Sequence, residues 1–291
     1  MTTQATPLPG AVRFLGLTLH DGVHRNHMLT FYLACYAAIM LATFVPQTQP
    51  FLLAEVLHLD PSKQGVVSGN LNFWGEIVII VTVGLWGSLS DRIGRRAVTS
   101  MGFLLIAGGI FMYGFARDIS GLLLGRVIYS AGIAAISTMI ITLMADYVCN
   151  PSRGKATGFL GIMNGLGAMT AALFLLKLPA MFKNSGMDAE GAAFATYASM
   201  AAFTLCLGAA MFFGLRRGVT HSGEHNPPML QQLREGMTEA RRPVIALAYA
   251  ASFVARGNLA VVGTFFTLWA ALYGTSELGL TSAEAISKGG I

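Results

Sequence analysis

The stretch GSLSDRIGRR, residues 87–96, places four charged residues within six positions, between two long apolar segments. The chain as a whole is 54% hydrophobic and only 11% charged, so this concentration of charge needs an explanation. Gly87 and Gly94 allow close helix approach and an unusual backbone angle, and arginines anchor a loop at the level of the lipid phosphates. The stretch therefore predicts a tight turn between two membrane helices. Asp91 adds nothing to such anchoring, which indicates that its carboxylate has a specific partner.

The composition of the chain indicates a membrane protein. A mean hydropathy of +0.60 is unusual for a soluble domain. A helix needs about 20 predominantly apolar residues to cross the hydrocarbon core of a bilayer. Such runs recur along the sequence, and they predict about seven transmembrane helices, at residues 28–46, 65–86, 97–116, 120–145, 156–176, 192–215 and 243–273. The expected fold class is therefore an all-α membrane protein embedded in the lipid bilayer.

The distribution of basic residues predicts which side of the membrane each loop faces. Most arginines and lysines lie in the segments that would be cytoplasmic if the N-terminus is cytoplasmic. This positive-inside bias predicts a cytoplasmic N-terminus in a multi-pass protein of the plasma membrane, the inner membrane of a bacterium. The net charge of +5 and the pI near 9.3 then reflect topology, and we expect no nucleic-acid partner.

Residue types that carry catalysis or hold metals show no useful pattern. The three cysteines and six histidines have no metal-ligand spacing, and the only G-x-G, at Gly165 and Gly167, lies inside an expected span. We therefore expect no metal, no cofactor and no enzymatic activity.

The expected organisation has four parts. Residues 1–27 form a cytoplasmic N-terminal segment, residues 28–215 a six-helix bundle, and residues 216–242 a cytoplasmic linker. Within the linker, residues 229–240 fit an amphipathic surface helix and a solvated connection equally well. Residues 243–291 hold a seventh helix and, from the capping box TSAE at Thr281, the start of an eighth. Because the chain stops soon after this start, we expect a truncated protein.

The decapeptide resembles the signature of the major facilitator superfamily of secondary transporters, G-x-x-x-D-[RK]-x-G-[RK]-[RK], in the same loop. The matching residues are Gly87, Asp91, Arg92, Gly94, Arg95 and Arg96. The resemblance implies a fold of twelve helices in two bundles and a conformational latch. In that latch the aspartate docks on a helix of the opposite bundle, which would lie beyond residue 291. The basic residues pair with an acid at the end of the fourth span, where Asp146 stands.

Two other patterns of the superfamily fit imperfectly. Arg126 and Gly132 match the fourth-span pattern of proton-coupled members, but Ser130 replaces its first glycine. Gly161 and Gly165 match the fifth-span antiporter pattern, but Leu166 replaces its proline. A stripe of small residues in the same span predicts close helix packing, at Gly158, Gly161, Gly165, Ala168 and Ala172.

Ionisable residues inside the expected spans are candidates for function because burying a charge in a bilayer is costly. Arg126 shares a helix face with Tyr129 and Ser130. In the seventh span, Arg256 lies near Asn258, and the first span contributes Tyr32 and Tyr36. The resemblance implies that spans one, four and seven line a central cavity, so these residues are candidates for binding an anionic solute. The alternative is that each arginine snorkels to the membrane surface or pairs with an acid to hold helices together.

Glu76 has two possible roles. A buried carboxylate has a raised pKa and can exchange a proton near neutral pH, which would suit proton coupling. The alternative is a structural pair with an arginine such as Arg126.

The leading hypothesis is a secondary active transporter that moves a small organic anion by alternating access, coupled to protons. The missing C-terminal bundle would be its partner. A drug or metabolite efflux transporter of the same superfamily is the second choice. A non-transporting fragment and a seven-span receptor are the remaining alternatives.

Overall fold

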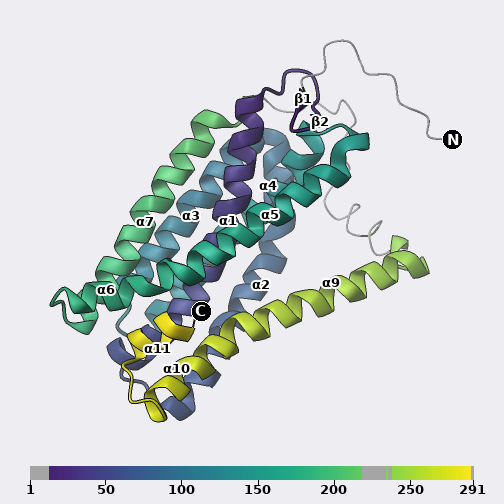
Figure 1. Cartoon of the computed structure of the whole chain (residues 1–291). Coiled ribbons are helices and arrows are strands. Elements are labelled where there is room, and N and C mark those ends of the chain that lie inside the picture. Colours follow the sequence, from purple (N-terminus) through teal and green to yellow (C-terminus); the bar gives the residue numbers. More distant parts are fainter. Residues whose placement is uncertain (1–12, 218–233, 235–237, 290–291) are drawn as a thin grey trace.

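The computed structural model describes residues 13–217, 234 and 238–289 (Figure 1). The chain is helical from Arg25 almost without interruption, apart from the turns between helices and the undescribed part of the linker. The elements are β1 (Arg13–Phe14), β2 (Leu17–Thr18), α1 (Arg25–Phe51), η1 (Leu52–Val56), α2 (Pro61–Ile93), α3 (Arg95–Phe115), α4 (Ile119–Tyr147), η2 (Asn150–Ser152), α5 (Arg153–Leu173), η3 (Leu175–Lys177), α6 (Leu178–Asn184), α7 (Ala189–Gly214), α9 (Pro243–Val261), η4 (Val262–Phe266), α10 (Thr267–Ser276) and α11 (Ser282–Gly289).

Six segments among the described residues are long and apolar enough to cross a membrane. They are Arg25–Val56, Pro61–Ile93, Arg95–Phe115, Ile119–Tyr147, Asn150–Asn184 and Ala189–Gly214. The seventh expected span is also helical and runs through α9, η4 and α10. The chain is therefore an all-α, multi-pass membrane protein. The first span is longer than expected, because α1 continues through Pro46 and Pro50, which membrane helices tolerate better than soluble ones.

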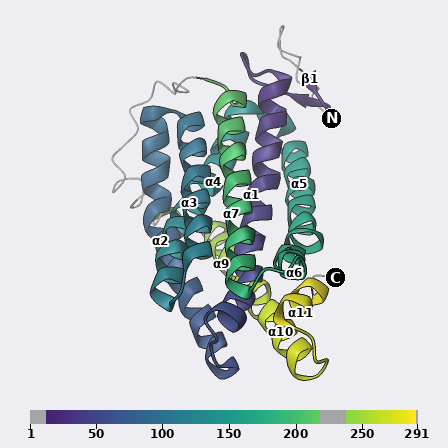
Figure 2. The same cartoon turned by 90° about the vertical axis from the view of Figure 1, so that its left-hand side faces the viewer.

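The two ends of the bundle carry different structures. One end, called here the hairpin end, holds β1, β2 and the turn between α2 and α3, while α6, α10 and α11 lie at the other end (Figures 1 and 2). At that other end, the carboxylates of Asp60, Asp118 and Asp188 accept backbone hydrogen bonds at the starts of α2, α4 and α7. The side-chain and backbone hydrogen bonds from Ser62 hold the pKa of Asp60 below its usual range.

Glycines bring α3 and α4 into backbone contact. A Cβ added at Gly109 would lie 2.5 Å from the backbone nitrogen of Tyr129, and one at Gly132 would lie 2.6 Å from the carbonyl oxygen of Gly102. The other side of α3 packs on α7, where the rings of Tyr113 and Tyr197 stack with centroids 5.6 Å apart. These contacts make α3 the centre of the most tightly packed part of the bundle.

The stripe of small residues predicted to pack α5 closely divides in two: Ala168 and Ala172 are half-buried, whereas its three glycines are not packed against any described helix. Gly158, Gly161 and Gly165 are exposed, and a Cβ on any of them would meet no described atom within 4 Å. Helix α5 instead packs on α1 through Gly167 and Ala171. Gly167 lies two positions after Gly165, which on a helix is a rotation of about 200° and so nearly the opposite face.

The described part of the N-terminal segment forms a short β-hairpin. Strand β1 pairs with β2, and the amide of Cys149 donates to Thr18 while the amide of His20 donates to the Tyr147 carbonyl, both at 3.0 Å. Leu17 and Leu19 are fully buried beneath it. The hairpin thus covers the loop between α4 and α5.

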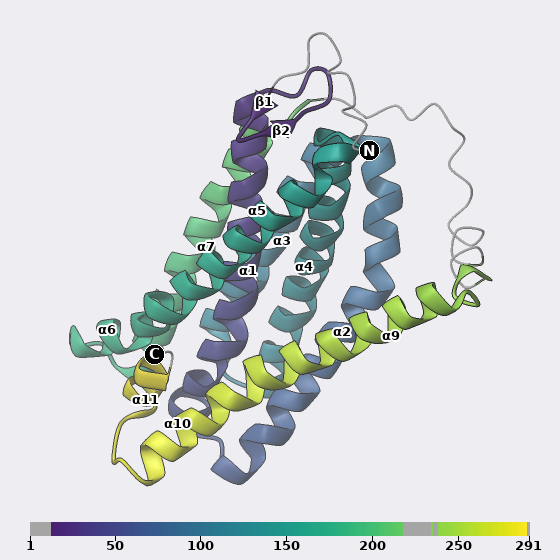
Figure 3. The same cartoon turned by 45° about the vertical axis from the view of Figure 1, so that its right-hand side comes forward.

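Among the described side chains, those of the seventh helical segment that are buried lie in its C-terminal half. The N-terminal part of helix α9 projects away from the bundle (Figure 1), whereas α10 contacts α1 and α2, and α11 contacts α1, η3 and α6 (Figure 3). Val244, Leu247 and Val254 of α9 are exposed, but Thr264 in η4 is only 4% exposed. The first described side chain of this segment that is buried is therefore that of Thr264 in η4.

Candidate functional site

A cavity of about 550 Å³ lies between α1, α2, α4, α5 and η4. Its wall is largely apolar and is formed by isoleucines such as Ile79 and Ile133 together with alanines. Polar side chains interrupt this wall at Thr43, Gln47, Asn72, Glu76, Arg126, Tyr129, Ser130, Ser137, Asn164 and Thr264. A mostly apolar cavity with few polar groups is the usual form of a small-molecule site.

Arg126 is the principal charged group of the cavity. Arg126 lies on α4 and is only 7% exposed. Its Nη2 donates a hydrogen bond to the Oδ1 of Asn72 on α2. Its Nε and Nη1 are buried and form no hydrogen bond of normal geometry with a described residue, and the buried hydroxyl of Tyr113 on α3 lies beside the guanidinium. Because a guanidinium can only donate hydrogen bonds, it can bind an oxygen atom that enters the cavity.

Gly75 makes room for this arginine. A Cβ at Gly75 would lie 2.9 Å from Nε of Arg126 and 2.8 Å from Oγ of Ser130. Any larger residue on α2 would therefore push the arginine and the serine out of their positions.

Tyr129 lies beside Arg126, and the guanidinium carbon is 5.6 Å from the centre of its ring. Its hydroxyl donates to the carbonyl of Leu41 at 3.0 Å, which ties α4 to α1. The structure therefore brings together three of the predicted site residues, Arg126, Tyr129 and Ser130, on one wall of the cavity. Glu76, the residue predicted to couple protons, lines the same cavity from α2.

Other predicted site residues do not reach the cavity. Tyr36 donates to Thr170 of α5 at 2.9 Å, and Tyr32 packs against Phe31 and Phe159. Both tyrosines lie on the face of α1 that turns toward α5, so neither lines the cavity. The backbones of Arg256 and Asn258 belong to α9, but their side chains lie outside the described part of the structure.

Sequence reasoning did not assign a site role to several polar residues of the cavity: Thr43, Gln47, Asn72, Asn164 and Thr264. Asn72 precedes Glu76 by one helical turn, a spacing that could have marked it. Gln47 and Thr264 carry no comparable signal, since a lone amide or hydroxyl in an apolar segment is common. Gln47 presents a buried Oε1 that has no donor among the described residues.

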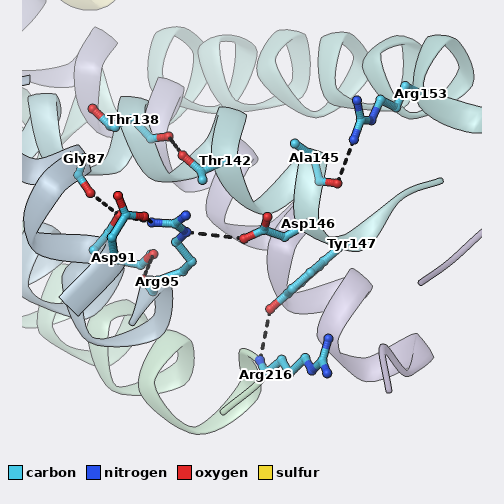
Figure 4. Close-up of polar contacts among 12 residues, drawn as sticks. Gly87, Asp91, Arg95, Thr138, Thr142, Ala145, Asp146, Tyr147, Arg153 and Arg216 are labelled. Atoms are coloured by element: carbon cyan, nitrogen blue, oxygen red, sulfur yellow. Dashed lines mark hydrogen bonds and ion pairs between the residues drawn. The ribbon is translucent and has the colours of Figure 1, made fainter. Parts of the chain in front are cut away.

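The decapeptide forms the turn between α2 and α3 at the hairpin end (Figure 4). Arg95 lies between two carboxylates, with Nη1 2.5 Å from Asp91 and Nε 3.3 Å from Asp146. It also donates to the hydroxyl of Ser90, which in turn donates to the carbonyl of Gly87 at 2.7 Å. This network joins α2, α3 and α4.

The remaining residues of the decapeptide have separate roles. Gly94 has a φ of +93° and links α2 directly to α3, a conformation that other residues rarely adopt. Gly87 is not at a close approach, because a Cβ there would lie 3.9 Å from the nearest atom, on Thr138. Arg96 stacks over Phe212 at 4.4 Å, and Arg92 is exposed.

Comparison with known proteins identifies the family. The family model described as Major Facilitator Superfamily matches residues 29–290, which is most of the chain. The chain belongs to this superfamily. Crystallised peptide transporter POT in complex with sulfate aligns with a TM-score of 0.56 at 16% identity, covering 91% of this chain and 51% of that one. At this identity the likeness establishes the superfamily fold.

Two magnetosome proteins are similar in sequence to this superfamily member. MamZ of Magnetospirillum gryphiswaldense is 28% identical over 255 residues, which cover 82% of this chain and 37% of MamZ. MamH of Paramagnetospirillum magneticum is 26% identical over 283 residues, which cover 92% of this chain and 61% of MamH. The chain therefore spans between about two fifths and three fifths of the length of these relatives.

Proposed function

We propose that the chain supplies the N-terminal half of the solute pathway in a secondary active transporter for small organic anions. The observation that carries this proposal is the buried guanidinium of Arg126, which lines the cavity and has two nitrogens that form no hydrogen bond of normal geometry with a described residue. A charge at the bilayer centre costs about 2.5–3.5 kcal/mol even on translocon-insertion scales. A solute carboxylate or phosphate ester would offset that cost by accepting hydrogen bonds from the guanidinium.

The proposal assigns the expected parts of the chain to this mechanism. Residues 28–215 form the N-terminal bundle, residues 1–27 and 216–242 are cytoplasmic, and residues 243–291 begin the second bundle. The rest of the second bundle would close the other side of the cavity, and alternating access would arise from rocking of the two bundles. Asp91, Arg95 and Asp146 would act as the latch at the cytoplasmic side, so that the hairpin end faces the cytoplasm.

Proton coupling is part of the proposal. Glu76 lines the same cavity as Arg126, so a change in its charge would alter the field that acts on a bound anion. We propose symport with protons across the bacterial inner membrane. Since MamZ and MamH are named magnetosome proteins, a magnetosome membrane is the alternative location.

Efflux of apolar, drug-like compounds is the second candidate function. It is favoured by the apolar lining of the cavity, which would bind such compounds without any charge. Membership of the superfamily excludes the seven-span receptor.

Binding of benzoate and of benzamide distinguishes the two candidates. The two compounds have nearly the same size and shape, but only benzoate is charged. We expect the full chain in lipid nanodiscs to bind benzoate more tightly than benzamide. We expect Arg126→Ala to lose this preference because the charge-assisted hydrogen bonds are removed. Arg117→Ala is the matched control, because Arg117 pairs with Glu190 outside the cavity. Equal binding of both compounds, unchanged by Arg126→Ala, would reject the anion site and favour apolar efflux.

A further inference from the structure

Asn72 uses both ends of its side-chain amide to connect three helical segments. Its Oδ1 accepts a hydrogen bond from Nη2 of Arg126 on α4, and its Nδ2 donates to Oγ1 of Thr264 in η4 at 2.6 Å. Asn72 itself belongs to α2. A continuous hydrogen-bonded connection therefore runs from the proposed anion site to the seventh helical segment.

The chemistry of the partners determines the orientation of this amide. Arginine can only donate hydrogen bonds, so the atom of Asn72 that faces Arg126 must be the oxygen. The NH₂ group is then left to face Thr264, whose hydroxyl can accept. Arg126 therefore sets the orientation of the Asn72 amide. A change in the hydrogen bond between Arg126 and Asn72 would alter the hydrogen bond between Asn72 and Thr264.

Thr264 occupies a special position in the seventh segment. It lies in η4, a single π-helical turn between α9 and α10, and such turns frequently occur at functional sites. Its side chain is buried, whereas described side chains of α9 such as Leu247 and Val254 are exposed. The bond to Asn72 thus joins the bundle to the point from which α9 projects.

We propose that Asn72 is an internal stand-in for the anionic group of the solute. The amide oxygen of Asn72 accepts the hydrogen bond from Nη2 of Arg126 that a solute oxygen accepts when the solute binds. A carboxylate displaces it because a hydrogen bond between two charged groups is stronger than one to a neutral amide, and because it can engage a second nitrogen of the guanidinium. Once displaced, Asn72 no longer holds Thr264, and η4 loses its hydrogen bond to α2.

This inference rests on the proposed function, because it requires an anion at Arg126. Asn72 is a positioning residue in this scheme, since it acts through Arg126 and Thr264. It supplies what alternating access needs, a contact between the two halves that breaks when the solute binds.

A distance measurement tests whether the loss of this hydrogen bond changes the position of the seventh helical segment. Spin labels at Leu104→Cys on α3 and Leu247→Cys on α9 report the separation of the two segments in the full chain in nanodiscs. Cys149→Ser and Cys206→Ser remove the accessible native thiols, and buried Cys35 stays. We expect Asn72→Ala and Thr264→Val to shift the distance distribution alike, and the double variant to shift it no further. Benzoate, but not benzamide, should produce the same shift in the labelled protein without these substitutions.

The matched control is Thr267→Val. Thr267 is a buried threonine one turn after Thr264, and its hydroxyl donates within its own segment, to the carbonyl of Gly263. The Thr267→Val substitution should leave the distances between the two spin labels unchanged. A shift with Thr267→Val as large as with Thr264→Val would overturn the specific link, and so would the absence of any shift with benzoate.

Two substitutions at Asn72 test the stand-in by the sign of their effect on benzoate affinity. Asn72→Ala removes the competitor, so benzoate should bind about 2- to 10-fold more tightly, the equivalent of one net hydrogen bond. Asn72→Asp places a permanent carboxylate on Arg126 and should weaken binding. If both variants weaken binding, Asn72 only supports Arg126 and the stand-in is rejected while the anion site stands. If Arg126→Ala leaves benzoate binding unchanged, the proposed function itself fails.

Discussion

Helices α4 and α5 both contain several glycines and both line the cavity, yet they use glycine in opposite ways. On α4, Gly132 faces α3 so closely that a Cβ would lie 2.6 Å from the carbonyl oxygen of Gly102. On α5, Gly158, Gly161 and Gly165 face open space. Among the described glycines of α5, only Gly167 has an atom of another helix within van der Waals range of an added Cβ.

The difference shows that a stripe of small residues indicates where close packing is possible, but does not determine which face of the helix packs against a neighbour. The α4 glycines are buried because the short turn between α3 and α4 forces those helices to be antiparallel neighbours. Helix α5 is joined to α4 through η2 and packs mainly on α1, so its orientation depends on which face fits α1. Substitutions of glycines in α4, in α5 and in the decapeptide test how each glycine is used.

The largest effect is expected for Gly132→Leu on α4. The side chain would overlap the backbone of α3 at Gly102 and Ile106, and a backbone cannot move aside as a side chain can. We expect a loss of more than about 3 kcal/mol of stability, or failure to fold. Thermal unfolding in detergent, followed by circular dichroism, measures it. An unfolding temperature within a degree of the unsubstituted protein would show that α3 and α4 are not in backbone contact.

The next effect is expected for Gly167→Ala on α5. Its Cβ would lie 2.3 Å from the carbonyl oxygen of Tyr36, so α5 must shift away from α1. We expect destabilisation of about 1–3 kcal/mol, typical of overpacking. Chemical unfolding in detergent gives the change in free energy. Gly167→Ala without any loss of stability would contradict the packing of α5 on α1 by this face.

Gly94→Ala should have a comparable or smaller effect, and it has an internal control within the decapeptide. Gly94 adopts a φ of +93°, so an alanine there would be strained by about 1–3 kcal/mol. Gly87 has ordinary space around it, so Gly87→Ala should be tolerated. The unfolding midpoint of Gly94→Ala should lie below that of Gly87→Ala. Equal midpoints would show that the backbone at Gly94 is not constrained.

The smallest effect is expected for Gly161→Ala on the open face of α5. Alanine favours a helix by up to about 1 kcal/mol over glycine, and nothing in the described structure obstructs it. Stability should be unchanged or slightly raised in the isolated chain. A clear loss of stability would mean that this face of α5 is packed in the folded protein, and the contrast with α4 would then disappear.

Much of the fold could be predicted from local sequence. The apolar runs predicted the helices because a membrane span must satisfy its own backbone hydrogen bonds. The charge cluster predicted the turn between α2 and α3, with Gly94 in a backbone conformation that suits glycine. The continuation of α1 beyond Pro46 was not predictable, because whether a proline ends a helix depends on its neighbours in space. Nor was the N-terminal hairpin, whose strands are two residues each.

The candidate site was predictable only in part. Arg126, Tyr129, Ser130 and Glu76 were found because ionisable and polar groups are conspicuous in an apolar helix, and the cavity brings these residues together. Tyr32 and Tyr36 were equally conspicuous but face α5. Asn72 and Thr264 are separated by 192 residues, and no spacing rule reaches across such a distance.

Sequence by itself determined which segments are helical and apolar, and which residues are too polar to face lipid, since both depend on side-chain chemistry and local periodicity. Only the tertiary structure decided which face of each helix meets a neighbour. That choice depends on the fit of whole surfaces, as the glycines of α4 and α5 show. The same packing decided that Asn72 stands between Arg126 and Thr264.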